Sequence, residues 1–256
     1  MKGFNKVILD LVFGAVIPIL ILNNFARVTG QSETLAYVFA ALVPVAYVLI
    51  DTFFISRRLN VITSYVALST IVSGGLVFWY VDGLRYAIKD TAALIAGFLV
   101  FAGSMLIRKP MLQFFAANIF QPDTSEKHKA LATLFADVNV RKSLFVGTGI
   151  VAAYNVLAGV VNFLLNLNMV KAVFGSADFN AQVAQVNFIT RIIFTVGSLA
   201  AFAGAIFLLY RALFARLPKE DDKSQFESEF WELVAKAGLL GNEELRIKNE
   251  ELKDER

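Results

Sequence analysis

Six apolar segments of membrane-spanning length are the feature that most limits what this chain can fold into. They cover about residues 7–28, 34–55, 61–81, 90–107, 143–170 and 187–210. A helix rises about 1.5 Å per residue, so about 20 residues cross a hydrocarbon layer roughly 30 Å thick. Each segment approaches or exceeds that length. The sequence therefore predicts an all-α, polytopic membrane protein with six transmembrane helices.

Composition supports a chain whose solvent is the bilayer. Hydrophobic residues make up 57% of the 256 residues, and the mean hydropathy is +0.62. A water-soluble domain of this size needs a larger polar shell. Cysteine is absent, which excludes disulfides, thiolate nucleophiles and iron–sulfur ligation. His128 stands between two lysines in a polar connection, and we interpret it as a solvated loop residue rather than a metal ligand.

Basic residues predict the orientation of the chain. Up to residue 217, twelve Lys and Arg residues fall on one side of the predicted spans and five on the other. By the positive-inside rule, the side with twelve faces the cytoplasm, together with both termini. We interpret the apolar start as an uncleaved first span, because it is longer than a signal-peptide core and no small-residue cleavage site follows it.

The fourth connection, residues 108–142, is predicted to contain two amphipathic helices at the cytoplasmic face. Pro110 ends the preceding span, and residues 111–120 are apolar but too short to cross, which predicts an in-plane or re-entrant helix. Asp123 or Thr124 would cap the second helix. Its apolar face would hold Leu131, Leu134, Phe135 and Val138. The basic residues of this connection would attract anionic lipids, or would serve only to fix the topology.

Residues 218–256 differ in composition from the membrane domain, residues 1–217. This tail carries seven Lys and Arg residues against twelve Asp and Glu residues, a net charge of −5. An amphipathic helix is predicted from the spacing of Phe226, Phe230, Leu233, Val234 and Ala237, ending at Gly238 or Gly241. Anionic lipid would repel its acidic face. We therefore expect the helix to dock on a protein surface through Phe226, Phe230 and Trp231, or to pack against its own chain.

Charged side chains in the apolar segments are functional candidates, because charges are costly to insert in lipid. These candidates are Asp10, Asp51, Asp90 and Arg191. Asp10 and Asp51 are predicted on the same cytoplasmic side, where proximity of two carboxylates would create a proton-binding site and ion pairs with cations would only join helices. Asp90 and Arg191 are predicted near the outer interface, as anchors or as contacts to a lipid head group.

A polar stripe marks the fifth segment. Its members, Asn155, Gly159, Asn162 and Asn166, share one helical face. This face is expected either to pack against small residues of other helices or to line a hydrated cleft or lipid groove opposite Asn23 and Asn24. Pro18 and Pro44 interrupt the first two spans, but the last three spans lack proline. That asymmetry argues against a carrier built from inverted repeats.

Motifs of known chemistry are absent from the sequence. It holds no glycine-rich phosphate loop, no HExxH zinc motif and no catalytic Ser/His/Asp set. We therefore predict a protein without catalysis, cofactor or metal site, and without a nucleic-acid partner. Its expected partners are the lipid bilayer, other membrane proteins and a second copy of the chain.

Five groups of residues along the chain form a recognisable pattern. They are Leu9-Asp10 with Pro18; Lys89-Asp90-Thr91; Arg108-Lys109-Pro110; Tyr154 with residues 157–162; and Asn187-Phe188 followed by Arg191. Together they resemble the bacterial intracellular septation protein A family and its uncharacterised six-helix relatives. The extended fourth connection and the acidic tail depart from that family's short-looped pattern. The resemblance implies a bacterial inner-membrane protein that acts in cell-envelope maintenance or division through contacts with other membrane proteins.

Three hypotheses for function follow, in order. The first is a six-helix scaffold or adaptor, based on the small-residue faces and the two cytoplasmic amphipathic segments. The second is a small-solute or proton-coupled transporter that uses Asp10, Asp51 and the asparagine stripe. The third is a lipid-modifying enzyme in which Asp90 and Arg191 contact a head group.

Overall fold

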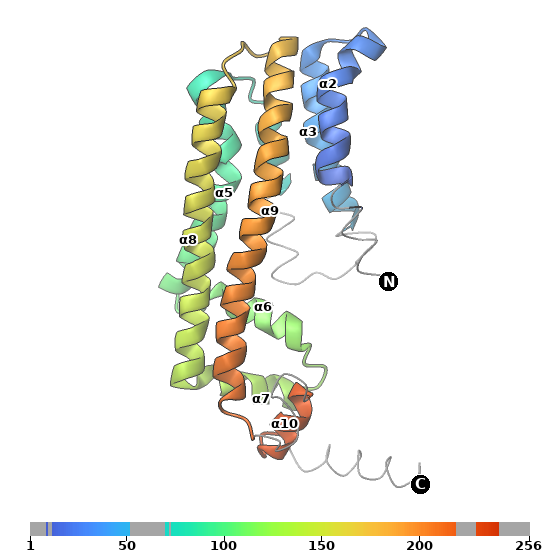
Figure 1. Ribbon diagram of the computed structural model, residues 1–256. Coiled ribbons are helices and arrows are strands. Elements are labelled where there is room, and N and C mark those ends of the chain that lie inside the picture. Colours follow the sequence, from blue (N-terminus) through green and yellow to red (C-terminus); the bar gives the residue numbers. More distant parts are fainter. Residues whose placement is uncertain (1–8, 10–11, 52–69, 72, 219–228, 241–256) are drawn as a thin grey trace, which may run out of the picture. The chain divides into compact units, whose positions relative to one another are not determined.

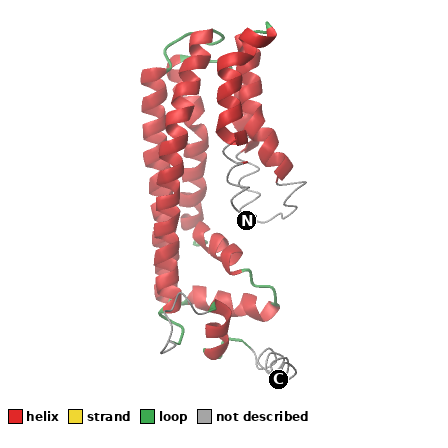
Figure 2. Ribbon diagram, turned by 45° about the vertical axis from the view of Figure 1, so that its right-hand side comes forward, coloured by secondary structure: helices red, strands yellow, loops and turns green. Residues whose placement is uncertain are grey.

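The computed structural model describes residues 9, 12–51, 70–71, 73–218 and 229–240. Every regular element in these ranges is a helix, and Figure 2 shows no strand among them. The predicted all-α class is therefore confirmed for the described part of the chain. In chain order (Figure 1) the elements are the π-helical η1 (Val12–Val16), α2 (Ile17–Thr29), α3 (Glu33–Ile50), α5 (Gly83–Leu106), α6 (Met111–Phe120), α7 (Ser125–Ala136), α8 (Val138–Met169), α9 (Ala177–Phe214) and α10 (Phe230–Lys236).

Four of the described helices, α3, α5, α8 and α9, are long and apolar enough to cross a membrane. Helices α2 and α6 are apolar but have only 13 and 10 residues. Within the predicted third segment, residues 61–81, positions 61–69 and 72 lie outside the described residues. A protein with membrane-spanning helices is thus supported, whereas the number six stays a prediction.

Helices α5 and α9 begin several residues earlier than the hydropathy pattern predicts, and α8 begins at Val138 rather than near residue 143. Helix α5 begins at Gly83 rather than near residue 90, and α9 begins at Ala177 rather than near residue 187. Polar side chains in the first two turns of α5 and α9 lower the local hydropathy, but partners within the protein satisfy them. Lys89 Nζ donates to a backbone carbonyl at 2.7 Å, and Asn180 Nδ2 donates to the Glu33 carboxylate at 2.7 Å. The polarity of the sequence is therefore not sufficient to predict where these helices begin.

The chain divides into two compact units. The first comprises Met1–Val100 and Ala152–Ala200, and the second comprises Phe101–Val151 and Ala201–Arg256. Helices α5, α8 and α9 each contribute residues to both. Helix α10, from the predicted acidic tail, belongs to the second unit together with α6 and α7.

In the first unit, α2 packs along α3, as Figure 1 shows. Helix α2 ends at Gly30, whose φ of +70° is a left-handed conformation that glycine adopts without a steric penalty. Helix α3 begins after Ser32, whose Oγ accepts a hydrogen bond from the Leu35 N–H at 3.3 Å. The sharp turn between these two ends brings the helices side by side.

The core of the first unit contains a cluster of aromatic rings. Tyr37 of α3, Tyr86 of α5 and Phe179 of α9 are buried. The ring centroid of Phe179 lies 5.9 Å from that of Tyr37 and 5.1 Å from that of Tyr86. Phe174, in the connection before α9, lies 5.4 Å from Tyr37 and 5.2 Å from Phe179. These edge contacts fix the first turns of α5 against α3 and α9.

In the second unit, two hydroxyl groups position the start of α6. Ser104 Oγ accepts a hydrogen bond from the Met111 N–H at 2.9 Å, and Thr148 Oγ1 accepts one from the Leu112 N–H at 3.2 Å. A helix N-terminus leaves such N–H groups without intrahelical partners, so these contacts stabilise it. The helix at residues 111–120 was predicted from sequence, and its bounds are confirmed. Its in-plane or re-entrant position stays a prediction.

Helix α7 begins after Thr124, one of the two predicted caps, whose Oγ1 accepts a hydrogen bond from the Lys127 N–H at 3.2 Å. Leu131, Leu134 and Phe135 are buried as expected. Val138 does not continue this face, because α7 ends at Ala136 and Val138 begins α8 with 78% of its surface exposed. The break follows from Asp137, which caps α8 by accepting hydrogen bonds from the next residues.

Candidate functional site

Helices α5 and α8 bring a carboxylate and two amides together in the first unit. Asn162 and Asn166 are four residues apart on α8 and point to the same side of the helix. Their Nδ2 groups both donate to Asp90 Oδ2, at 3.0 and 2.9 Å. Both asparagines are buried. The predicted asparagine stripe therefore contacts one of the predicted intramembrane acids, although the sequence indicated the two features only separately.

Two further contacts tie this cluster to the helix backbones. Asn162 Nδ2 also donates to Thr91 Oγ1 at 3.2 Å, while the Thr91 hydroxyl donates to the Ala87 carbonyl at 2.8 Å. Asn166 Nδ2 donates to the Asn162 carbonyl at 3.0 Å. Within the described part of the protein, Asn166 Oδ1 is buried without a hydrogen-bond partner. The Asn166 amide is thus turned so that its Nδ2 group donates to Asp90 and to the Asn162 carbonyl.

Lys89, next to Asp90, has a separate set of partners. Its Nζ donates to the Trp79 carbonyl at 2.7 Å and lies 4.9 Å from the ring centroid of Tyr37 and 5.8 Å from that of Tyr86. The side chain is only 6% exposed. An ammonium over aromatic faces is stabilised by cation–π attraction, which gains strength when water is excluded. The aromatic core thus holds a cation beside the Asp90 cluster.

A cavity of about 400 Å³ borders both charged residues. Its wall is made by α3, by α5 and by four residues between them, Thr70, Ser73, Leu76 and Val77. Besides Lys89 and Asp90, the lining residues are Tyr37, Ala41, Pro44, Val45, Val48, Thr70, Ser73, Leu76, Val77 and Ala93. The polar groups of this lining are therefore one acid, one ammonium and the hydroxyls of three side chains, Tyr37, Thr70 and Ser73.

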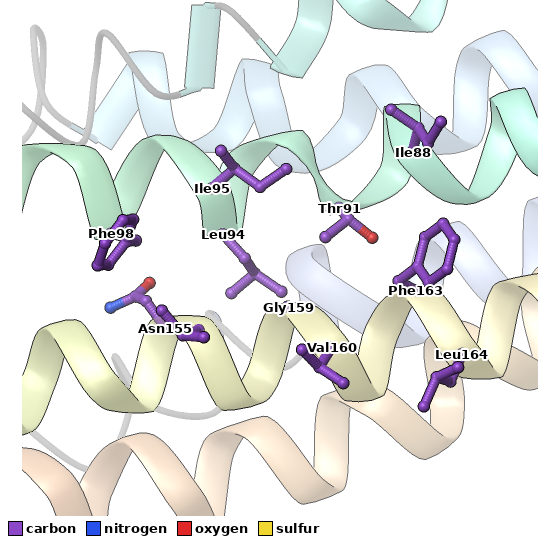
Figure 3. Close-up of a pocket in the computed structure, with 11 residues that line it drawn as sticks. Ile88, Thr91, Leu94, Ile95, Phe98, Asn155, Gly159, Val160, Phe163 and Leu164 are labelled. Atoms are coloured by element: carbon purple, nitrogen blue, oxygen red, sulfur yellow. The ribbon is translucent and has the colours of Figure 1, made fainter.

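An apolar groove of about 320 Å³ lies between α5 and α8. Figure 3 shows Thr91 and Leu94 of α5 across from Gly159 and Val160 of α8. A methyl group on Gly159 would lie 3.6 Å from Thr91 Cγ2, which is ordinary van der Waals contact. Asn155, the first member of the predicted stripe, also lines this groove. The stripe therefore divides between a polar cluster at one end and an apolar groove at the other.

The remaining predicted polar residues are not part of this cluster. Asn24 is engaged within α2, where Nδ2 donates to the Leu20 carbonyl at 3.0 Å and Oδ1 accepts from Arg27 at 2.7 Å. Asn23 and Arg191 are exposed. Asp51 follows the last residue of α3, and Asp10 lies outside the described residues. The predicted pairing of Asp10 with Asp51 therefore stays a prediction.

The predicted docking residues of the tail contact the second unit itself. The ring of Phe230 is stacked on that of Phe120 at a centroid distance of 4.0 Å. Trp231 Nε1 donates to the Phe120 carbonyl at 2.9 Å, and Lys127 Nζ lies 5.5 Å from its ring centroid. Phe226 lies outside the described residues. Packing against the chain's own surface was the alternative left open by the sequence, and Phe230 and Trp231 take part in such packing.

Sequence reasoning missed the role of Lys89 and its aromatic neighbours. Lys89 was used only as a topology determinant and as part of the family resemblance, although Tyr86 precedes it by three residues on the same helical face. That spacing was a usable signal. Tyr37 lies far from Lys89 in the sequence, and the Trp79 contact is made by a backbone carbonyl, which no residue type reveals. Only the fold brings these partners together.

Comparisons of the chain with protein-family models, with curated proteins and with solved structures find no match. The resemblance to the septation protein family stays a prediction, and the site must be interpreted from its own chemistry.

Proposed function

We propose that this protein is a membrane-embedded carrier of a small polar solute or of protons, with its binding site in the cavity beside Lys89 and Asp90. One observation carries the proposal. Two consecutive residues of opposite charge, on a helix apolar enough to cross a membrane, both line a cavity of about 400 Å³. Ionisable residues within membrane helices are costly, and they commonly mark substrate paths and proton relays.

The cavity has the size and the polar groups that a small solute needs. Ligand pockets usually measure about 300–1,000 Å³ and combine apolar walls with a few polar groups. Here Thr70 and Ser73 add hydroxyls to the charged pair. Pro44 of α3 also lines the cavity, and because proline lacks an N–H it removes the helical donor for the Ala40 carbonyl. Interrupted membrane helices use such carbonyls to bind substrates and ions.

This proposal keeps the transporter hypothesis but moves its centre. The transporter hypothesis from sequence used Asp10 and Asp51, whereas the charged residues that line the cavity are Lys89 and Asp90. Asn162 and Asn166 hold the Asp90 carboxylate rather than lining the cavity themselves. In the proposed carrier they are positioning residues, and no catalytic step is involved.

Flux measurements with purified full-length protein in sealed proteoliposomes test the proposal. Proton flux is followed with an entrapped pH-sensitive dye under an imposed potassium gradient, and solute flux is followed by osmotic swelling in a panel of small sugars, amino acids and amines. We expect at least one flux above that of empty liposomes. Asp90→Asn should lower it by about tenfold, equivalent to about 1.4 kcal/mol in the transport barrier.

A matched variant controls for the loss of a negative charge. Asp178→Asn neutralises an exposed acid near the start of α9 and should leave the flux unchanged. Ser73→Leu, which reduces the cavity without altering charge, should lower solute flux as Asp90→Asn does. Wild-type proteoliposomes that match empty ones for protons and for every solute would contradict the carrier proposal.

A scaffold or adaptor in cell-envelope maintenance or division is the second candidate. In the second unit, a methyl group added at Gly103 or at Gly204 would meet no atom within 4 Å. Glycines open to the lipid allow another helix to approach closely. Because the chain has no cysteine, Gly204→Cys gives a clean cross-linking site in native membranes. Linked species at Gly204→Cys, and none at the exposed control Leu199→Cys, would favour this candidate.

A further inference from the structure

The apolar groove between α5 and α8 has a shape and a lining that suit a hydrocarbon chain. Its α5 wall runs from Ile88 to Phe98, and its α8 wall runs from Asn155 to Leu164. Ten residues of helix extend about 15 Å, which is half of a hydrocarbon layer roughly 30 Å thick. The groove therefore has the length of an acyl chain within one leaflet.

The lining offers almost nothing to water or to a polar ligand. Figure 3 shows Ile95, Phe98 and Val160 among the side chains around it. Of its two polar residues, Thr91 is hydrogen-bonded to the Ala87 carbonyl and to Asn162, and Asn155 is engaged in interactions within the protein. An unfilled apolar groove loses dispersion contacts on its open side. In a bilayer, acyl chains are the groups available to supply them.

Both rims of the groove face the surroundings of the protein. Ile88 and Ile95 on α5 are 47% and 49% exposed, and Val156 and Val160 on α8 are 46% and 51% exposed. Both helices are apolar enough to cross a membrane. The medium that reaches these rims is therefore lipid, and a chain can enter the groove sideways.

Charge distinguishes the two ends of the groove. Arg85 is exposed and lies three residues before Ile88, on the same face of α5. Lys171 is exposed just after α8 ends at Met169. At the other end, α5 from Phe98 to Leu106 carries no charged residue. Basic residues near the membrane surface attract anionic phosphates, so a lipid would enter with its phosphate at the Arg85 end.

From these features we propose that the groove is a binding site for a membrane phospholipid. One acyl chain fills the space between α5 and α8, and the phosphate lies near Arg85 and Lys171. Because Thr91 belongs both to the groove and to the Asp90 cluster, the bound chain also covers the lipid side of that cluster. The groove and the cavity share no lining residue, although neighbouring positions of α5 contribute to both. The lipid site therefore does not depend on the carrier proposal.

A photoreactive lipid tests the site directly. Full-length protein is placed in phosphatidylcholine vesicles that contain a phosphatidylglycerol with a diazirine in the middle of one acyl chain, and labelled residues are identified by mass spectrometry. We expect labelling at Ile95 and Val160 well above labelling at Leu199, which is 65% exposed on α9 and lines neither this groove nor the cavity beside Lys89. Equal labelling of all three would mean ordinary surrounding lipid and would overturn the proposal.

Variants that fill the groove provide the second comparison. Gly159→Leu places a side chain beside Thr91 and Leu94, and labelling at Ile95 should fall to the level at Leu199. Val160→Trp fills the groove from its exposed rim and should give the same loss if Gly159→Leu does not fold. Unchanged labelling at Ile95 in a folded variant of either kind would overturn the site.

Competition identifies the head group that the site requires. Unlabelled phosphatidylglycerol should displace the probe from Ile95 more effectively than diacylglycerol or a free fatty acid with the same chains. Arg85→Gln should remove most of that difference. Equal competition by all three lipids, before any substitution, would overturn the phosphate assignment. The readout is labelling at named residues and is independent of any flux.

Discussion

Removing the amides that hold Asp90 gives the sharpest test of the buried cluster. Asn162→Ala deletes the donors to Asp90 Oδ2 and Thr91 Oγ1, and Asn166→Ala deletes a second donor to the same carboxylate oxygen. Hydrogen bonds between membrane helices average about 0.6 kcal/mol in double-mutant cycles, with a maximum of about 1.7 kcal/mol. Bonds to an ionised group are roughly twice as strong as neutral ones.

The expected coupling energy between Asp90 and either asparagine is therefore about 1–1.7 kcal/mol. It is measured by a double-mutant cycle with Asp90→Ala, Asn162→Ala and the double variant, and by the same cycle with Asn166→Ala. Unfolding is followed by circular dichroism as the mole fraction of a denaturing detergent rises. The cycle separates the pairwise energy from the loss of packing that each alanine causes.

Asn168→Ala is the matched control, because Asn168 lies on the same helix, is exposed, and donates to the Leu164 carbonyl of its own helix. Its effect should add to that of Asp90→Ala within about 0.3–0.5 kcal/mol. If Asn162 and Asn166 also prove additive with Asp90, the carboxylate does not depend on these amides. The interpretation of the cluster as one unit would then be refuted.

Three further outcomes are expected. Gly147→Ala should lower stability by about 1–3 kcal/mol, because the new methyl group would overlap Leu112 and approach the Ala205 backbone. The control Gly204→Ala meets no atom within 4 Å and should leave stability unchanged. Chemical denaturation compares the two variants, and equal effects would contradict the packing at Gly147. Trp231→Phe deletes the hydrogen bond to the Phe120 carbonyl and should cost about 0.5–1.5 kcal/mol, with faster limited proteolysis of the tail; an unchanged cleavage rate would count against it. Burial opposes ionisation of Asp137, but bonds from the Val140 and Asn139 N–H groups and from Arg216 outweigh it and lower the pKa of this carboxyl. Its stabilisation is therefore present above the unfolded-state pKa of about 4 and lost as pH falls through the folded-state pKa. Asp137→Asn should accordingly be less stable than wild type at pH 7, with the gap closing in acid; a constant gap in thermal midpoints would refute the charge effect.

Local sequence patterns were sufficient to predict several elements of the fold. The short helix at residues 111–120 was predicted from Pro110 and from an apolar run too short to cross a membrane, and its bounds are confirmed. Thr124 was one of two predicted caps for the next helix, and its hydroxyl makes the capping contact. Both features depend on neighbouring residues, and such information is complete within a short stretch of sequence.

The helix ends and the site depended on contacts across the fold. Hydropathy placed the start of α5 near residue 90, because the charged residues Arg85 and Lys89 precede that position. In the protein, Lys89 is bound by the Trp79 carbonyl and two tyrosine rings, and Asp90 by amides more than 70 positions away. Such partners change the cost of burying a charge, and single-sequence patterns do not record them.

The consecutive placement of Lys89 and Asp90 also has an electrostatic consequence for the cavity that both residues line. Neighbouring residues on a helix are separated by about 100° around its axis. Turning α5 in either direction would present one sign of charge more fully to the interior while withdrawing the other. In the proposed carrier, the rotational position of this single helix would set whether the cavity prefers anions or cations.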